Sequence, residues 1–256
     1  MAVTYSCCLE AKDVLDLNFD LAKFSGVNVQ LNFYHGFPKN HDAILDQLGQ
    51  NDISVTSIHA PTVAFSDPEF FHLIKAMQDI YEVSTITIHP VKSPKSDLVQ
   101  IKSAEMNALL DLEGQLTDSD VQICLENFPS RGRNGNDQRW VYDPLSLFGL
   151  ACVMPHLGIT YDISHTVEGI DLLTEFELVS SKVGVLHLSN RIIPDNSDEK
   201  WQVHLPYRRG SLMAPQLVGY LSSTKFQGEV VLEYDARFMD KMLLDYQELT
   251  EVTKDP

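Results

Sequence analysis

Thr85-Ile86-Thr87-Ile88-His89 is the stretch of the chain that indicates the fold most directly. Its polar and apolar side chains alternate with a period of two, and β-branched residues fill it, as is typical of a strand. His89 shares one face of this strand with Thr85 and Thr87, while Ile86 and Ile88 take the opposite, helix-facing side. The stretch therefore predicts a strand that packs isoleucines against helices and ends in an inward-facing imidazole.

Similar strands recur along the whole chain, and a helical or helix-sized segment follows each of them. The predicted strands span residues 3–8, 27–33, 53–59, 85–89, 121–126, 159–162, 183–187 and 229–233. Repeated strand–helix alternation predicts parallel strands with covering helices. Eight such units in about 250 residues match the size of a (β/α)₈ barrel. We therefore predict an α/β fold, a (β/α)₈ TIM barrel forming one domain over residues 1–256. A doubly wound open sheet is the alternative, disfavoured because no glycine-rich phosphate turn follows the first strand.

The helices are predicted from apolar residues at helical spacing. Val14, Leu17, Leu21 and Phe24 predict one helix that Gly26 closes. Further helices are predicted around residues 44–48, 68–82, 101–112, 143–150, 172–179, 217–221 and 240–253.

Composition and charge exclude several classes of protein. The 256 residues include 19 Lys and Arg against 36 Asp and Glu, a formal net charge of −17. This charge disfavours nucleic acid and anionic membranes as partners, because both require basic side chains. The apolar runs are strand-sized, so no transmembrane segment is expected, and residues 1–5 lack the features of a secretory signal. The four cysteines have no disulfide or zinc-knuckle spacing, which predicts reduced thiols in a cytoplasmic protein.

Six predicted strands end in an imidazole or a carboxylate. These residues are His59, His89, Glu126, Asp162, His187 and Glu233. In a barrel, the carboxyl ends of the strands meet at one mouth, where barrel enzymes keep their active sites. Three carboxylates there would repel one another unless a cation offset their charge. Mixed His and carboxylate ligands suit Zn²⁺, Mn²⁺ or Fe²⁺ better than Ca²⁺. We predict a divalent metal, Mn²⁺ or Zn²⁺, with Mg²⁺, Co²⁺ or Fe²⁺ as alternatives.

Each of these residues, taken alone, is more often a capping or hydrogen-bonding group than a ligand, so the prediction depends on their agreement. His165, three residues after Asp162, and His204, after the seventh strand, are further candidates. His41 and His72 are expected at the surface, and His35 is as consistent with the surface as with the mouth. The basic loop over residues 130–136 is expected to hold an anionic substrate group or to be solvated.

Several motifs resemble the xylose-isomerase-like barrel superfamily, which contains sugar isomerases and epimerases as well as AP endonucleases of the endonuclease IV type. The motifs are Ser57-Ile58-His59-Ala60-Pro61, Thr87-Ile88-His89-Pro90, Leu125-Glu126-Asn127, Tyr161-Asp162-Ile163-Ser164-His165, Leu186-His187-Leu188-Ser189 and Leu232-Glu233-Tyr234. The resemblance covers essentially the whole chain, in the right order. It is specific for the superfamily and weak for a particular substrate.

In the isomerase and epimerase branch, the resemblance implies one divalent metal. The implied ligands are Glu126, Asp162, His187 and Glu233, and the two glutamates would also transfer protons on either side of the substrate. In the endonuclease branch, the resemblance implies a cluster of three zinc ions. Its further ligands would be His59, His89, His165 and His204, together with an aspartate at the position that Gln202 occupies here. A neutral amide is a poor zinc ligand, so Gln202 departs from this pattern; Asp195 and Asp198 are possible substitutes.

We therefore predict a metal-dependent isomerase or epimerase of a small sugar, sugar phosphate or polyol derivative. Glu126 and Glu233 would transfer the proton through a metal-stabilised enediolate. The histidines outside the metal set would orient hydroxyls, and Arg209 or the Arg131/Arg133 loop would bind a phosphate. The alternatives are a zinc-dependent phosphodiesterase, a lyase or dehydratase, and a non-catalytic metal-binding relative. The oligomeric state stays open, with a homo-oligomer as one option.

Overall fold

The computed structural model describes residues 3–94, 97–116, 120–128, 137–139, 141, 143–166, 169–194, 201–224 and 226–252. Within these residues, eight parallel strands close into a barrel in the order β1-β12-β9-β8-β6-β4-β3-β2. Their bounds are β1 Thr4–Glu10, β2 Asn28–Asn32, β3 Ser54–His59, β4 Thr85–Ile88, β6 Gln122–Glu126, β8 Leu157–Asp162, β9 Val183–Leu188 and β12 Glu229–Leu232. Each strand coincides with one of the predicted segments, so the predicted barrel is confirmed.

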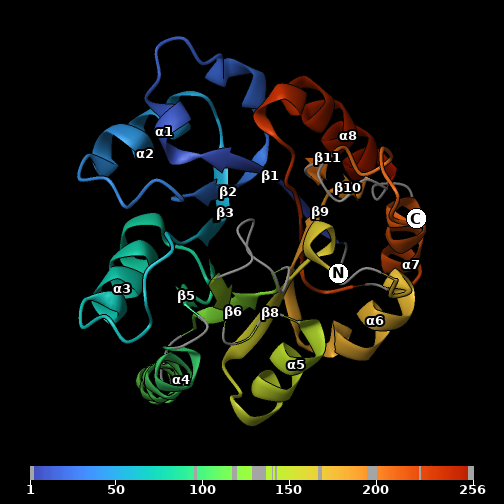
Figure 1. The fold of residues 1–256 in the computed structure, drawn as a ribbon. Coiled ribbons are helices and arrows are strands. Elements are labelled where there is room, and N and C mark those ends of the chain that lie inside the picture. The colour runs from blue at the N-terminus through green and yellow to red at the C-terminus, as the bar shows by residue number, and fades with distance from the viewer. Residues whose placement is uncertain are drawn as a thin grey trace.

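Helices surround the strands as an outer ring (Figure 1). They are α1 Ala11–Val14, α2 His41–Gln50, α3 Phe70–Tyr81, α4 Leu98–Gln115, α5 Pro144–Val153, α6 Leu172–Val179, α7 Ala214–Thr224 and α8 Met239–Val252. Among the described helices, none combines the length and the apolar character that crossing a bilayer requires.

The predicted helix over residues 14–24 is wrong. The chain forms only the short α1 and a 3₁₀ turn over Leu21–Phe24, and Leu17 between them is fully exposed. The backbone N–H of Asn18 donates to Asp16 Oδ1 at 2.9 Å, and the N–H of Phe19 donates to the Asp16 carbonyl at 3.0 Å. Asp and Asn side chains that bond locally in this way compete with helix formation. Val14, Leu21 and Phe24 are buried nevertheless, but from two separate turns.

Two small antiparallel ladders were not predicted. Strand β5, Lys92–Pro94, pairs with β7, Asp137–Arg139, and β10, Asn190–Ile192, pairs with β11, Gln202–Leu205. Both ladders are built from segments that follow barrel strands. They therefore lie at the end of the barrel formed by the carboxyl ends of the strands, where (β/α)₈ barrels keep their active sites.

The barrel interior combines a hydrogen-bonded polar network with a small buried cluster of Cys124, Val185 and Val231, whereas the outer faces of its strands are apolar. Ile86 and Ile88 are buried on the helix-facing side, as the alternation in this strand predicts. Inside, Thr87 Oγ1 lies 2.8 Å from Thr160 Oγ1, and Gln30 Nε2 donates to Ser57 Oγ at 3.2 Å. All four interior side chains are inaccessible to solvent. The inner wall below the mouth therefore presents hydrogen-bonding groups to the side chains above it.

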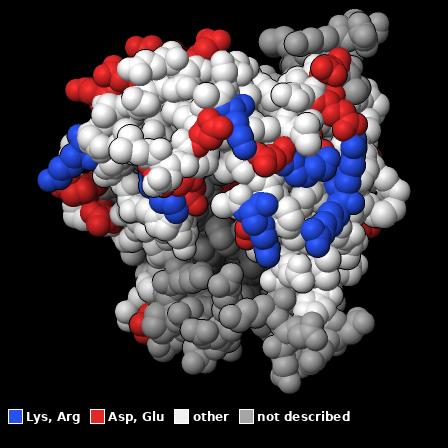
Figure 2. Space-filling model, turned by 90° about the horizontal axis from the view of Figure 1, so that it is seen from above, with Lys and Arg blue, Asp and Glu red and all other residues white. Residues whose placement is uncertain are grey.

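Acidic and basic side chains are mixed on the face over α1, α2 and α8 (Figure 2). Lys23 Nζ lies 2.8 Å from Asp240 Oδ1, and Lys241 Nζ lies 2.8 Å from Asp245 Oδ1. Arg208, which follows β11, donates to Glu248, which lies on α8 as Lys241 and Asp245 do. Carboxylates thus offset several of the cations on this face, which lowers the positive potential available to a phosphate backbone.

Candidate metal centre

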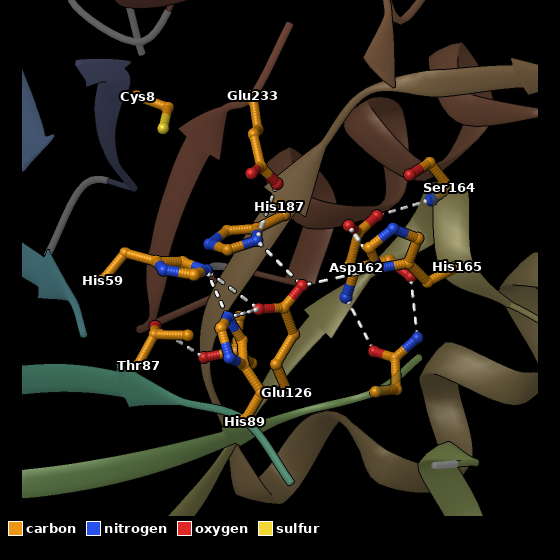
Figure 3. Close-up of polar contacts among 12 residues, drawn as sticks. Cys8, His59, Thr87, His89, Glu126, Asp162, Ser164, His165, His187 and Glu233 are labelled. Carbon is orange, nitrogen blue, oxygen red and sulfur yellow. Dashed lines mark hydrogen bonds and ion pairs between the residues drawn. The ribbon is translucent and has the colours of Figure 1, made fainter. Parts of the chain in front are cut away.

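The four residues that the sequence proposes as metal ligands meet at the mouth of the barrel (Figure 3). Glu126 ends β6, Asp162 ends β8, His187 lies in β9 and Glu233 directly follows β12. One ligand atom from each lies within 4.8 Å of the others, and we call this set the four-ligand group. Glu126, Asp162 and His187 are at most 2% exposed. Four strands thus bring three carboxylates and one imidazole into one small, buried space.

Strand pairing explains why these side chains meet. Asp162 and His187 are opposite each other in the β8–β9 register, and the N–H of Glu233 donates to the Leu188 carbonyl at 3.3 Å, which extends the β9–β12 ladder. His187 Nδ1 lies 2.9 Å from Glu233 Oε2 and 3.6 Å from Glu126 Oε1. One ring nitrogen therefore lies between the two glutamates.

Asn127 fixes the ends of β6 and β8 relative to each other. Its side-chain amide donates to the Asp162 carbonyl at 2.8 Å, and its side-chain oxygen accepts from the Asp162 N–H at 2.7 Å. The carboxylate of Asp162 is held as well, because Oδ1 accepts from the Ser164 N–H at 2.7 Å. This leaves Oδ2 of Asp162 directed to the site. No pattern in the sequence indicated this role for Asn127.

A second set, the His59 group, consists of His59, His89 and Glu126. His59 Nε2 lies 3.0 Å from Glu126 Oε2, and His89 Nε2 lies 3.8 Å from the same oxygen. The two imidazole nitrogens are 3.3 Å apart. Thr62 Oγ1, 2.9 Å from His89 Nδ1, orients this ring from behind. Glu126 thus belongs to both groups, with one carboxylate oxygen facing each.

A third set, the His204 group, consists of Asp162, His165 and His204. His165 Nδ1 lies 2.9 Å from Asp162 Oδ2 and 3.4 Å from Glu126 Oε1. His204 has a φ of 54°, a left-handed conformation that is costly for a non-glycine residue, and its carbonyl accepts from the Asp235 N–H at 2.8 Å. Strain of this kind persists where the surrounding structure enforces it, often at a functional site.

The third set lacks a fourth protein ligand among the described residues. Gln202 is exposed on β11. Asp195 and Asp198, the possible substitutes, lie outside the described residues, as do Arg131 and Arg133.

The buried charges at the mouth are strongly coupled. Burial raises the pKa of Glu126, but the neighbouring imidazoles of His165, His187 and His59 outweigh burial and hold this pKa well below its usual range. Burial likewise opposes the ionisation of Glu233, yet His187 and His204 lower its pKa. Burial lowers the pKa of His165, but the adjacent carboxylate of Asp162, with help from Glu126, raises it to about 10. Protonated imidazoles thus balance the carboxylates when no cation does so.

The donor set fits a divalent cation. Asp162 Oδ2, His187 Nδ1 and Glu233 Oε2 are buried, and none has a hydrogen bond of acceptable geometry within the described residues. Such atoms are rare in proteins and call for a partner. Nitrogen and oxygen donors in this ratio suit Zn²⁺ or Mn²⁺, and a cation would replace the imidazole protons as the source of positive charge. The four-ligand group would hold such a cation.

The remaining candidate residues belong to none of the three groups described above. Arg209 is exposed in the loop after β11, with its guanidinium carbon 5.4 Å from the centre of the Phe238 ring. His72 is exposed, as predicted. His35 is also exposed, and its Nε2 lies 3.2 Å from Glu10 Oε2 rather than at the metal centre.

The prediction that His41 lies at the surface is wrong, because the residue is partly buried. Its Nδ1 lies 3.1 Å from the Tyr81 hydroxyl, and its ring centre lies 4.1 Å from that of Phe37. These contacts draw His41 into an aromatic cluster between α2 and α3.

Two further residues at the site were missed by the sequence reasoning. Cys8 lies on β1 beside Glu233 (Figure 3), and burial, followed by the charge of Glu233, raises the pKa of its thiol well above the ordinary value. The neutral thiol is a weak ligand. Arg191, 2% exposed, donates to the carbonyls of Ser164 and Thr166 and so holds the turn that carries His165. The alternation of side chains along β1 places Cys8 on the inward face and could have indicated it. No sequence pattern indicated Arg191.

Solved structures with the same fold include several enzymes. A D-tagatose 3-epimerase-like protein shares 17% sequence identity, with 99% of each chain covered and a TM-score of 0.72. AP endonuclease, family 2 from Brucella melitensis shares 16% identity, covering 93% of this chain and 98% of that one, with a TM-score of 0.68. The IOLI protein with a binding zinc atom shares 14% identity over 96% of both chains, with a TM-score of 0.68.

No protein-family model and no curated protein matches the chain. The structural likeness confirms the predicted resemblance to xylose-isomerase-like barrels at the level of the fold. At these identities it shows the fold alone, so the function must be argued from the site.

Proposed function

We propose that the protein is a metal-dependent isomerase or epimerase of a small sugar, sugar phosphate or polyol derivative, acting as a single barrel domain. The observation that supports this function is the four-ligand group, in which two glutamates from separated strands face one cation site. Strands β6 and β12 are separated by β8 and β9 on one side of the barrel and by the other four strands on the other side. Glu126 and Glu233 therefore approach the site from different directions.

Isomerisation and epimerisation both require one proton to be removed and one to be returned. A divalent cation in the four-ligand group would supply Lewis-acid polarisation of a carbonyl and its neighbouring hydroxyl. Glu126 and Glu233 have lowered pKa values, so both are ionised at neutral pH and each can accept a proton. One glutamate would remove the proton, and the other would take up a proton from solvent and deliver it at the adjacent carbon or on the opposite face.

The remaining histidines suit the orientation of substrate hydroxyls. His59 and His89 line the same buried space as Glu126, and His165 lies at its other edge. A mouth with several imidazoles offers both donors and acceptors, which a polyhydroxylated substrate needs. The epimerase-like solved structure and the zinc-bound structure of the IOLI protein support a metal-dependent reaction on a sugar-like compound.

The test is proton exchange into substrate from deuterated water, using metal-loaded protein and a panel of aldoses, ketoses and their phosphates. We expect the wild type to exchange one carbon-bound proton, and Glu126→Gln and Glu233→Gln each to lose at least a hundredfold in rate. Glu248→Gln is the matched control, because Glu248 is exposed on α8 and pairs with Arg208. A metal-loaded wild type that exchanges no proton in any sugar of the panel would refute the proposal.

A zinc-dependent phosphodiesterase is the second candidate, and the His59 and His204 groups favour it. With the four-ligand group they offer donors for more than one cation. The net charge of −17 and the exposed Gln202 oppose it. Elemental analysis separates the candidates: we expect one metal ion per chain for the isomerase, whereas two or three ions and nicking of an abasic duplex at low salt would favour the hydrolase.

A further inference from the structure

Gln30 is a buried residue inside the barrel that contacts the metal-ligand candidate His187. It lies on the inward face of β2 and is inaccessible to solvent. Its Oε1 lies 3.0 Å from His187 Nε2, although the two residues are 157 positions apart in the sequence. A side-chain carbonyl accepts and never donates a hydrogen bond, so this contact requires a proton on His187 Nε2.

Two hydroxyls fix the orientation of the Gln30 amide. Its Nε2 donates to Ser57 Oγ at 3.2 Å and to Thr87 Oγ1 at 3.5 Å. Thr87 is held in turn by Thr160, with 2.8 Å between their hydroxyl oxygens. Because both amide hydrogens have acceptors on one side, Oε1 is left to face His187. The interior threonines and serine thus form a buried polar support beneath the metal centre.

The other nitrogen of the same ring faces the proposed cation site. His187 Nδ1 lies 2.9 Å from Glu233 Oε2 and 3.6 Å from Glu126 Oε1. An imidazole binds a metal only through a nitrogen without a proton, and the partner of the other nitrogen decides which one that is. We propose that Gln30 is the positioning residue that keeps the proton of His187 on Nε2 and presents Nδ1 to a divalent cation.

The choice of an amide has an electrostatic reason. Metal-bound histidines commonly donate their second N–H to a carboxylate, a carbonyl or water. Here the four-ligand group already contains three carboxylates, so a neutral acceptor fixes the ring without adding a fourth negative charge to a buried site. This inference rests on the proposed metal centre but not on the proposed reaction.

The experiment compares Gln30→Leu, which removes the acceptor, with Gln30→Glu, which retains one. Zinc affinity is measured by competition with a chelator. Loss of a partner of this kind typically weakens metal binding by 10- to 100-fold, and we expect this for Gln30→Leu. Gln30→Glu keeps an acceptor but adds the fourth negative charge, so it should lose less zinc affinity than Gln30→Leu. Gln122→Leu is the control, because Gln122 is exposed at the start of β6, at the opposite end of that strand from Glu126, and it should leave zinc affinity unchanged.

A second measurement needs no variant. In zinc-loaded wild type labelled with ¹⁵N-histidine, we expect His187 Nε2 to carry an attached proton and Nδ1 to show the shift of a metal-bound nitrogen. Zinc bound through Nε2, or wild-type affinity in folded Gln30→Leu, would overturn the inference. A wild type that binds no zinc or manganese would overturn both this inference and the metal centre. Normal zinc binding without proton exchange in any sugar would instead refute only the proposed reaction.

Discussion

Replacing Asp162 with asparagine tests the electrostatic coupling of the site. The carboxylate of Asp162 lies 2.9 Å from His165 Nδ1. At an effective dielectric constant of about 20, two unit charges at this distance attract by about 6 kcal/mol, which corresponds to about 4 pKa units. The pKa of His165, about 10 in the wild type, should therefore fall to about 6 in the variant. Asparagine keeps an oxygen that can accept from the Ser164 N–H, so the local turn should survive.

The shift has a consequence for stability whose sign follows from linkage. A histidine with a raised folded-state pKa stabilises the folded protein fully below its unfolded pKa of about 6.5, and this contribution is lost as pH rises toward about 10. Between pH 7 and 9, the folded wild type retains a proton that the unfolded chain releases. The free energy of unfolding should therefore fall by up to about 1.4 kcal/mol per pH unit, or about 2.7 kcal/mol in total, on account of His165. Asp162→Asn should lack this part of the decline.

The assay is urea unfolding of chelator-treated protein at pH 7, 8 and 9. His187 also has a raised pKa and adds a decline of the same sign to both proteins, so the informative quantity is the difference between them. Asp171→Asn is the matched control, because Asp171 is an exposed helix cap whose side chain accepts from the Thr174 N–H. Zinc should flatten the decline in the wild type, since a cation replaces the protons. Equal declines in wild type and Asp162→Asn would refute the charge pairing.

Three further predictions concern other parts of the barrel. Gly184→Ala should destabilise the protein by about 1–3 kcal/mol in urea unfolding, because the added carbon would lie 2.5 Å from Gln122 Oε1 and 2.7 Å from Cys124 Sγ. Adding Gln122→Ala should restore only part of the lost stability. Full restoration would contradict the clash with Cys124. Arg209→Ala should raise KM severalfold for phosphorylated sugars and leave kcat and neutral sugars unchanged in steady-state assays; an equal loss for both substrate classes would exclude a phosphate-binding role. His89→Asn should raise KM but leave one metal ion per chain by elemental analysis, whereas loss of an ion would favour a multinuclear hydrolase.

The sequence predicts the candidate metal centre because residues at the carboxyl ends of barrel strands meet at one mouth, however far apart they are in the chain. Glu126, Asp162 and Glu233 each stand where a predicted strand ends, and barrel closure brings such positions to one mouth. Period-two alternation also predicts which side chains point inward, and the contact between Thr87 and Thr160 agrees with it. These inferences need only the strand boundaries and the parity of each strand.

Contacts between specific side chains could not be predicted in this way. The reciprocal bonds of Asn127 with the Asp162 backbone depend on the exact stagger of β6 against β8. The contact between Gln30 and His187 crosses the barrel interior and depends on rotamers at both ends. The left-handed backbone conformation of His204 is imposed by its neighbours, and the residue type does not predict it. Likewise, the turn at Asp16 displaced a helix because a local side-chain bond outweighed weak apolar periodicity.

Charge at the mouth bears on the class of substrate. The four-ligand group carries three carboxylates, so a divalent cation leaves a net charge of about −1 within a protein of formal charge −17. A phosphate ester adds about −1.5 to −2 at pH 7, and its approach to such a mouth is opposed by the field. Arg209, exposed beside Phe238 in the loop after β11, is the cation that we predict to offset part of that repulsion. A neutral sugar needs no such offset. Among the proposed sugar substrates, neutral sugars are therefore the class that electrostatics favours. A phosphorylated sugar should depend on Arg209 and bind more weakly when that charge is removed.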